Sequence, residues 1–179
     1  MSLTLRRVAL SAVLVALIVV TSRFVQIPLF ATTRLDLSYA IVMVAALLLG
    51  PLYGGTVGFL ARAVGDLAFS GGIKIPYALG SAAMGAIIGL AQKYWLCKIS
   101  NKALRFAASA AAAAVGAAVG FIGIVPALGA LLFGAGYMVV LAHGATAALV
   151  DTIVASALGY PLYRILVKTP AVKPFEPIK

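Results

Sequence analysis

The sequence predicts an all-α integral membrane protein with six transmembrane helices and with both termini in the cytoplasm. Of its 179 residues, 64% are hydrophobic and only 10% are charged, and the mean hydropathy is +1.14. A soluble domain of this length has too much surface to carry so few charges. The apolar runs are continuous and do not alternate with polar residues, which favours membrane helices over the strands of a membrane barrel.

The first three helices are predicted at residues 3–20, 38–49 and 52–69. A spanning helix needs roughly 20 mostly apolar residues, and fewer where protein shields it from lipid. The first run follows two arginines as in a signal peptide, but no polar domain follows it, so we interpret it as a retained helix. Gly50 and Pro51 separate the short second helix from the glycine-rich third one.

The last three helices are predicted at residues 77–94, 103–125 and 137–167. A loop at 70–76, with two glycines and a proline, precedes the fourth helix. Pro126 and the glycines that follow it predict a break or a re-entrant turn before the sixth helix. Residues 1–168 therefore form one membrane domain, and residues 169–179, rich in proline and lysine, form a cytoplasmic tail that we expect to be disordered.

The basic residues set the orientation. Six helices bring both termini to one side, and ten of the 14 basic residues fall there: Arg6, Arg7, Lys93, Lys98, Lys102, Arg105, Arg164, Lys168, Lys173 and Lys179. Cytoplasmic loops carry such an excess, which makes that side cytoplasmic. The other four, together with two of the acids, collect toward the outer face: Arg23, Arg34, Arg62 and Lys74, with Asp36 and Asp66. The polar connector 21–40 then faces outward.

Several function classes are excluded by motif and composition. The net charge of +10 sits at the ends of apolar runs, without an aromatic-interleaved patch, so we predict no nucleic-acid partner. Cys97 is the only cysteine, and the sequence has no phosphate-loop, HExxH or GxSxG motif. With only four acidic residues, we predict no enzyme, no metal site and no cofactor. A chain that binds a solute without its own energy source needs a gradient or a partner.

Small residues mark one face of the first helix. Ala9, Ala12 and Ala16 follow one another at i, i+3 and i+7. Small side chains let helices approach closely in lipid, so this face either docks on another membrane protein or packs within the bundle.

Four features, in order, resemble the substrate-binding S components of energy-coupling factor (ECF) vitamin transporters. They are Asp36-Leu37-Ser38 at the entry to the second helix, LLLGPLYGG at 47–55, Gly65-Asp66 in the third helix, and TSRF at 21–24, which is similar to the folate and hydroxymethylpyrimidine branch. That branch usually carries a PGFT-like stretch before the fourth helix, whereas this chain has IPYALGS at 75–81. The resemblance therefore does not name a particular vitamin.

The resemblance implies a high-affinity binding subunit, not an enzyme, in a bacterial cytoplasmic membrane. Such a subunit captures a vitamin or related heterocyclic micronutrient outside the cell. It would be surrounded by lipid and assemble with a transmembrane coupling subunit and two cytosolic ATPase subunits, and Ala12 and Ala16 fit the family's AxxxA contact with the coupling subunit. The alternative is a stand-alone, ion-coupled secondary transporter of a small polar solute that uses Asp66 or Asp151 for its ion.

Four charged side chains are the first candidates for ligand binding. Arg23 can pair with a carboxylate, a phosphate or a ring edge, or it extends to the interface. Arg62 and Asp66 are spaced i, i+4 and either bind the ligand or fix the third helix as a buried pair. Asp151 lies within the sixth helix and is the acid that we favour most as a ligand contact.

Three ring-bearing side chains complete the predicted site. Tyr77, Tyr137 and His143 can stack on a flat heterocycle and hydrogen-bond to it, although each tyrosine also suits an interfacial aromatic belt. Arg34 and Asp36 are expected to pair and to hold the outer connector, and Lys74 and Gln26 have weaker claims.

Overall fold

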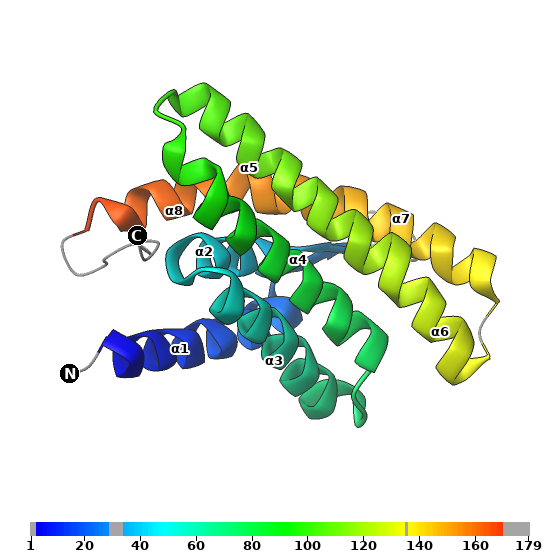
Figure 1. Cartoon of the computed structure of the whole chain (residues 1–179). Coiled ribbons are helices and arrows are strands. Elements are labelled where there is room, and N and C mark those ends of the chain that lie inside the picture. Colours follow the sequence, from blue (N-terminus) through cyan, green and yellow to red (C-terminus); the bar gives the residue numbers. More distant parts are fainter. Residues whose placement is uncertain (1–2, 29–33, 135, 170–179) are drawn as a thin grey trace.

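The protein is a helical bundle, described here from a computed structural model at residues 3–28, 34–134 and 136–169. Six helical segments of the described chain run between its two ends (Figure 1). The first four are α1 (Leu3–Phe24), α2 (Ser38–Leu49), α3 (Pro51–Ser70) and α4 (Ile75–Tyr94). After the short helix η1 (Leu96–Lys98), the fifth consists of α5 (Lys102–Ala117), the π-helical η2 (Ala118–Ile124) and α6 (Val125–Phe133). The sixth consists of α7 (Tyr137–Val154), the π-helical η3 (Ala155–Gly159) and α8 (Tyr160–Val167).

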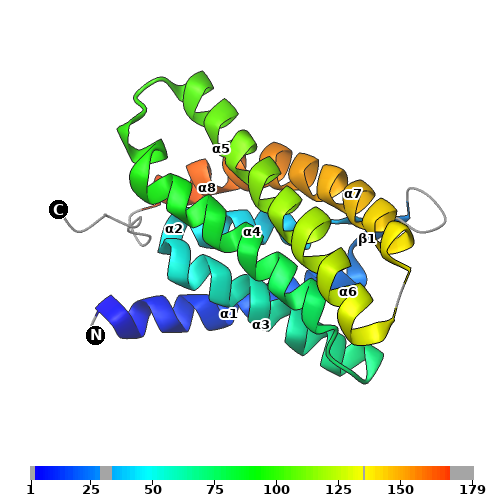
Figure 2. The same cartoon turned by 45° about the vertical axis from the view of Figure 1, so that its right-hand side comes forward.

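The bundle has two distinct ends. The start of α1, the end of α8 and the α4–α5 connection lie at one end, which we call the terminal end (Figures 1 and 2). The α3–α4 and α6–α7 connections lie at the opposite end, together with a short β-hairpin (Figure 2). We call this the hairpin end. The candidate functional site lies at this end.

Four segments of the described chain are long and apolar enough to cross a membrane: Thr4–Phe24, Ile75–Lys98, Lys102–Phe133 and Tyr137–Val167. Helix α2 is apolar but has only 12 residues. Helix α3 has 20 residues, but it carries Arg62 and Asp66 and is not among the four. The structure therefore agrees with a helical, multi-pass membrane protein, and the count of six spans stays a prediction.

The polar connector departs from the all-α prediction. Helix α1 continues four residues past its predicted end, to Phe24, and the chain then forms strands β1 (Gln26–Pro28) and β2 (Arg34–Asp36). The strands are antiparallel, with Gln26 opposite Asp36. Pairing satisfies backbone groups that an open connector would leave to water, and it delivers Asp36 to the start of α2.

The sequence predicts a break or re-entrant turn at Pro126 and the glycines at 129, 134 and 136, and the chain does break in this stretch, but not at Pro126. Pro126 lies in the first turn of α6, where a missing backbone N–H is tolerated, and the wider π-helical turn of η2 precedes it. The fifth segment is therefore continuous from Lys102 to Phe133. The break comes instead at Gly134, whose φ of 61° is the left-handed conformation that glycine adopts at helix ends.

Helix α2 forms the centre of the core (Figure 2). Every one of its residues except Ile41 is buried, and it contacts α1, α3, α4, α7, η3 and α8. Beside it, α3 and α4 pack backbone against backbone at Gly54 and Gly85. A Cβ at Gly85 would overlap the carbonyl group of Gly54, so only glycine permits this approach. This close contact brings the polar faces of α3 and α4 to the same side of the bundle.

Candidate functional site

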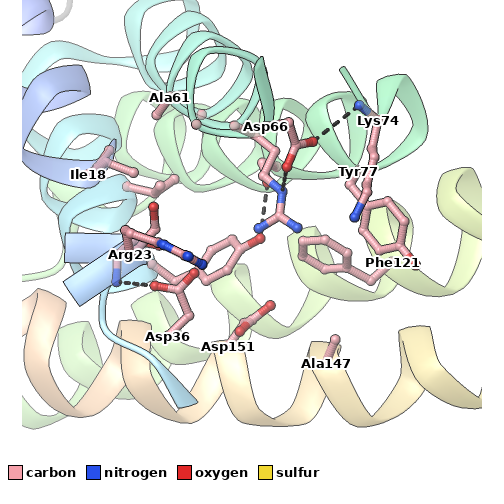
Figure 3. A pocket seen from close by; sticks show the side chains of 18 of the residues that line it. Ile18, Arg23, Asp36, Ala61, Asp66, Lys74, Tyr77, Phe121, Ala147 and Asp151 are labelled. Carbon is pink, nitrogen blue, oxygen red and sulfur yellow. Dashed lines mark hydrogen bonds and ion pairs between the residues drawn. The ribbon is translucent and has the colours of Figure 1, made fainter. Parts of the chain in front are cut away.

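A cavity of about 300 Å³ opens at the hairpin end of the bundle (Figure 3). It is lined by residues from α1, β2, α2, α3, α4, η2 and α7. Residues three or four apart share a helix face, which explains how each helix reaches it. Helix α7 contributes His143, Ala147 and Asp151, and helix α4 contributes Tyr77 and Ser81.

The α3 wall of the cavity carries the predicted ion pair. The Nε atom of Arg62 lies 3.6 Å from Oδ1 of Asp66. The other carboxylate oxygen of Asp66 accepts a hydrogen bond from the backbone N–H of Lys74 at 3.2 Å, so Asp66 also fixes the start of α4. The Arg62 guanidinium carbon lies 5.6 Å from the centre of the Tyr77 ring. Arg62 is thereby held in the cavity by one acid and one aromatic face, within cation–π range.

The α2 wall is an ordered set of buried polar and aromatic groups. The carboxylate of Asp36 accepts a hydrogen bond from the backbone N–H of Ser38 at 2.9 Å, at the first turn of the helix. The hydroxyl groups of Tyr39 and Ser81 share a hydrogen bond at 3.1 Å. The Tyr39 ring meets the edge of Phe121 with the centroids 5.7 Å apart and the planes at 86°. These contacts fix the inner surface that a ligand would meet.

Asp151 differs from the other two acids of the cavity. It is 5% exposed, and its carboxylate points from α7 into the cavity, facing the wall that carries Asp66 (Figure 3). Within the described part of the chain, no hydrogen bond or ion pair joins its side chain to another residue. A buried carboxylate without a partner is energetically unfavourable, so Asp151 is available to a ligand that brings a donor or a positive charge.

The mouth of the cavity is basic. Arg23 lies in the last turn of α1, is exposed, and places its guanidinium carbon 5.4 Å from the centre of the Phe69 ring. The side chain of Lys74 is also exposed, whereas Asp36, Asp66 and Asp151 are all buried. The cavity therefore presents exposed cations at its mouth, and Arg62, three acids and aromatic rings inside. Such a surface can orient a flat polar ring that carries hydrogen-bond donors on one edge.

Residues 2–168 match the family model described as the ECF-type riboflavin transporter, S component. The chain belongs to this family. The members of the family are transporter components and not enzymes, in agreement with the prediction from the sequence motifs. Family membership also supports a substrate-binding component of an ECF transporter in a multi-pass membrane protein.

The curated relatives of this S component match it in part. A UPF0397 protein of Streptococcus thermophilus (strain ATCC BAA-491 / LMD-9) is 32% identical over 87 residues, which cover 49% of this chain and 48% of the relative. A UPF0397 protein of Aliivibrio fischeri (strain MJ11) is 41% identical over 64 residues, covering 36% and 35% of the two chains. The matched part therefore spans about half or less of the length of these relatives.

A solved structure extends the likeness over almost the whole S component. The crystal structure of FolT bound with folic acid superimposes with a TM-score of 0.65 at 21% identity. The match covers 94% of this chain and 98% of FolT. This likeness confirms the fold. The folate or hydroxymethylpyrimidine branch stays a prediction, as does every individual ligand contact.

Six of the seven predicted site residues of the S component line the cavity: Arg23, Arg62, Asp66, Tyr77, His143 and Asp151. Tyr137 does not line it, and it is 46% exposed at the start of α7. It precedes His143 by six residues, a rise of about 9 Å along the helix, which places it beyond the mouth. The side chains of Gln26 and Arg34 lie outside the described residues, so the predicted pairing of Arg34 with Asp36 stays a prediction.

Sequence reasoning missed Tyr39, Ser81 and Phe121 as cavity residues. Tyr39 follows the Asp36-Leu37-Ser38 motif directly, and Ser81 lies one turn after Tyr77, so helix periodicity could have found both. Phe121 lies in the π-helical segment η2, where the ordinary helical periodicity fails, and no sequence signal pointed to it.

The alanine face of α1 is free of the bundle. Ala9, Ala12 and Ala16 are all exposed, whereas Leu14 and Ile18 of the same helix are buried against the core. Internal packing therefore does not account for the small residues. Their predicted role as the contact with a coupling subunit stays a prediction.

Proposed function

We propose that this S component is the high-affinity substrate-binding subunit of an ECF-type importer in a bacterial cytoplasmic membrane. It captures a vitamin or related heterocyclic micronutrient from outside the cell. The observation that carries the proposal is the cavity at the hairpin end, in which the carboxylate of Asp151, without a hydrogen bond or ion pair among the described residues, faces Arg62 and buried aromatic groups. A polar heterocycle would supply the hydrogen-bond partners that this carboxylate lacks.

In the proposed orientation, six segments cross the membrane and the terminal end faces the cytoplasm. Basic residues at the starts and ends of the helices support this orientation: Arg6, Arg7, Lys93, Lys98, Lys102, Arg105, Arg164 and Lys168 belong to the terminal end. Helices α2 and α3 are too short or too polar to span alone. The burial of α2 among six other elements supports its crossing in protein rather than in lipid.

The aromatic and acidic lining favours a flat heterocycle with N–H or amino donors. Asp151 would accept from such an edge, the rings of Tyr77 and Phe121 would contact its face, and Arg23 would reach an acidic or polar substituent at the mouth. Riboflavin, folic acid and hydroxymethylpyrimidine all combine a flat ring with polar edges, so they form the first panel to test.

Uptake against a gradient would come from partner subunits. A transmembrane coupling subunit would dock on the exposed face of Ala9, Ala12 and Ala16, where small side chains permit close helix contact. Two cytosolic ATPase subunits would supply the energy through it.

Two experiments test this function. Mass spectrometry of small molecules that co-purify with the chain, followed by calorimetric titration with the panel above, should find one heterocycle that binds. In vesicles, the chain alone should bind that compound without accumulating it, and accumulation should require the coupling subunit, both ATPases and ATP. Accumulation by the chain alone under a proton or sodium gradient would overturn the proposal.

One observation favours a second candidate function, a stand-alone ion-coupled transporter. Asp151 is buried in the membrane domain without a partner in the described chain, and such acids serve as proton or sodium sites in secondary transporters. The vesicle experiment separates the two functions, because only this candidate accumulates solute without ATPases.

A further inference from the structure

A second cluster of buried polar side chains lies at the terminal end, away from the cavity. It consists of Gln92 near the end of α4, Arg105 in the first turn of α5, Ser156 in η3, and Tyr160 and Tyr163 in α8. We call these five residues the terminal-end cluster. None of them lines the cavity, and the function proposed above assigns them no role.

The hydroxyl group of Tyr163 is the centre of this cluster. It receives a hydrogen bond from Nε2 of Gln92 at 3.3 Å and one from Nη2 of Arg105 at 3.4 Å. The ring of Tyr160 lies beside that of Tyr163, with the centroids 6.2 Å apart, and meets the edge of Phe106 at 5.5 Å. Three separate helical segments therefore converge on one small volume.

Four polar atoms of this cluster are buried and lack a hydrogen-bond partner. They are Oε1 of Gln92, Nε of Arg105, Oγ of Ser156 and the hydroxyl oxygen of Tyr160. Gln92, Ser156 and Tyr160 are each less than 10% exposed. Most buried polar groups in proteins are paired, and leaving one unpaired is unfavourable. An added group that pairs with these four atoms would remove this penalty.

Turning the Gln92 amide over, so that Oε1 and Nε2 exchange places, indicates which kind of occupant the cluster would bind. The two ends of an amide have nearly the same shape, so the group fits its surroundings equally well when it is turned over. Tyr163 then donates to Oε1, and Nε2 becomes the unpaired atom. In that arrangement every unpaired group is a donor: Nε2 of Gln92, Nε of Arg105, and the hydroxyls of Ser156 and Tyr160. The site then requires an occupant with several acceptor oxygens.

The positive charge of Arg105 also favours an occupant with acceptor oxygens. Arg105 forms no ion pair within the described part of the chain, and the described acids Asp36, Asp66 and Asp151 all line the cavity at the other end. A partly buried guanidinium without a counter-charge favours an anion, and its fork of donors matches a phosphate or carboxylate group.

We propose that the terminal-end cluster is a binding site for a phosphate group, held by Arg105 together with Tyr160, Ser156 and Gln92. The tetrahedral arrangement of phosphate oxygens lets it accept from donors on three helical segments at once. Free phosphate and the headgroup of a phospholipid share this chemistry, and both are available at the membrane surface.

The first test asks whether removing the Tyr160 hydroxyl raises or lowers the melting temperature of the protein. Tyr160→Phe keeps the ring contacts with Phe106 and Tyr163 and removes only the hydroxyl. In phosphate-free, lipid-free detergent, where the site is empty, the variant should melt at the same temperature as the wild type or higher, because an unpartnered hydroxyl has been removed. Added inorganic phosphate should raise the melting temperature of the wild type more than that of the variant and reverse their order.

The second test measures affinity for inorganic phosphate at constant ionic strength. Arg105→Gln should weaken binding by roughly ten- to a hundredfold, the loss expected for one charge-assisted hydrogen bond. Lys102→Gln is the matched control, because Lys102 is exposed in the same turn of α5 and carries the same charge. It should bind phosphate like the wild type.

A third arm identifies the source of the phosphate group. Short-chain phosphatidylglycerol that competes with inorganic phosphate in the wild type, and not in Arg105→Gln, would assign the site to a lipid headgroup. Binding of inorganic phosphate without such competition would assign it to free phosphate. The proposal is overturned if neither compound shifts the wild-type melting curve, or if Lys102→Gln loses as much affinity as Arg105→Gln. A Tyr160→Phe variant that melts lower in phosphate-free detergent, with no response to phosphate, would overturn it as well, because the site would then hold water only.

Discussion

Replacing Asp151 by asparagine should raise the stability of the empty protein and lower its affinity for the ligand. Asp151 is 5% exposed and has no hydrogen bond or ion pair within the described chain, so burial disfavours its charge and no direct contact offsets that cost. An asparagine side chain at this position would occupy nearly the same volume without the charge. Removing the buried charge should therefore stabilise the empty protein, and about 1 kcal/mol of stabilisation shifts the melting temperature of a chain of this size by roughly 2–4 °C.

The same substitution should cost affinity. A hydrogen bond to a charged group contributes about 1.5–3 kcal/mol, so losing the charge should raise the dissociation constant roughly ten- to 150-fold. The assay is calorimetric titration with whichever of riboflavin, folic acid and hydroxymethylpyrimidine the wild type binds most tightly, together with melting curves of the empty proteins.

Asp36→Ala is the control, because it removes a second acid from the same cavity. The Asp36 carboxylate accepts a hydrogen bond from the backbone N–H of Ser38 at 2.9 Å, and alanine has no acceptor to replace it, so this variant should lower the melting temperature of the empty protein. The two variants are thus expected to move stability in opposite directions. A lower melting temperature for Asp151→Asn would refute the idea that its carboxylate is unpartnered, and an unchanged dissociation constant would remove it from the binding site.

Three further predictions concern other parts of the molecule. Ala12→Trp should prevent assembly with the coupling subunit and stop uptake while leaving ligand affinity within about twofold, since Ala12 is exposed on α1; normal co-purification of the two subunits would exclude this face. Gly85→Val should destabilise the bundle by about 1–3 kcal/mol or more because the α3 backbone occupies the required space, whereas Gly72→Val, with no neighbour within 4 Å, should melt like the wild type. Arg23→Ala should weaken binding about tenfold or more if its guanidinium contacts the ligand; if Arg23 only stacks on Phe69 at the mouth, titration will show no change.

Much of the fold could be predicted because lipid permits few alternatives. Continuous apolar runs located every helical segment, and Gly50-Pro51 ended α2 at Leu49, as the structure has it. The fifth helix runs to Phe133 and not only to Val125 as predicted, because a proline, although usually a helix breaker, is tolerated in the first turn of α6 after a π-helical segment. Residues 25–36 show no strand signal strong enough to separate a hairpin of three-residue strands from an irregular loop.

The candidate site was predictable where charge is rare. An ionisable residue in a membrane helix stands out against its apolar surroundings, which is why Arg62, Asp66 and Asp151 were found. Aromatic residues do not stand out in the same way. Tyr137 and Phe121 are both aromatic residues in apolar segments, and only the three-dimensional path of α7 and η2 decides that the second lines the cavity and the first does not.

The burial of α2 has a consequence for how the protein is made. Its 12 residues rise about 18 Å as a helix, whereas the hydrocarbon core of a bilayer is about 30 Å thick. Helix α2 therefore cannot be retained in the bilayer as an independent segment when it leaves the ribosome-bound insertion machinery. Its hydrophobic side chains are matched to neighbouring helices and not to lipid, and α3 and α4 are synthesised after it. In the proposed six-span arrangement, α2 would need a protected environment until those helices arrive, and the cavity at the hairpin end would be completed only when α2, α3 and α4 enter the membrane together.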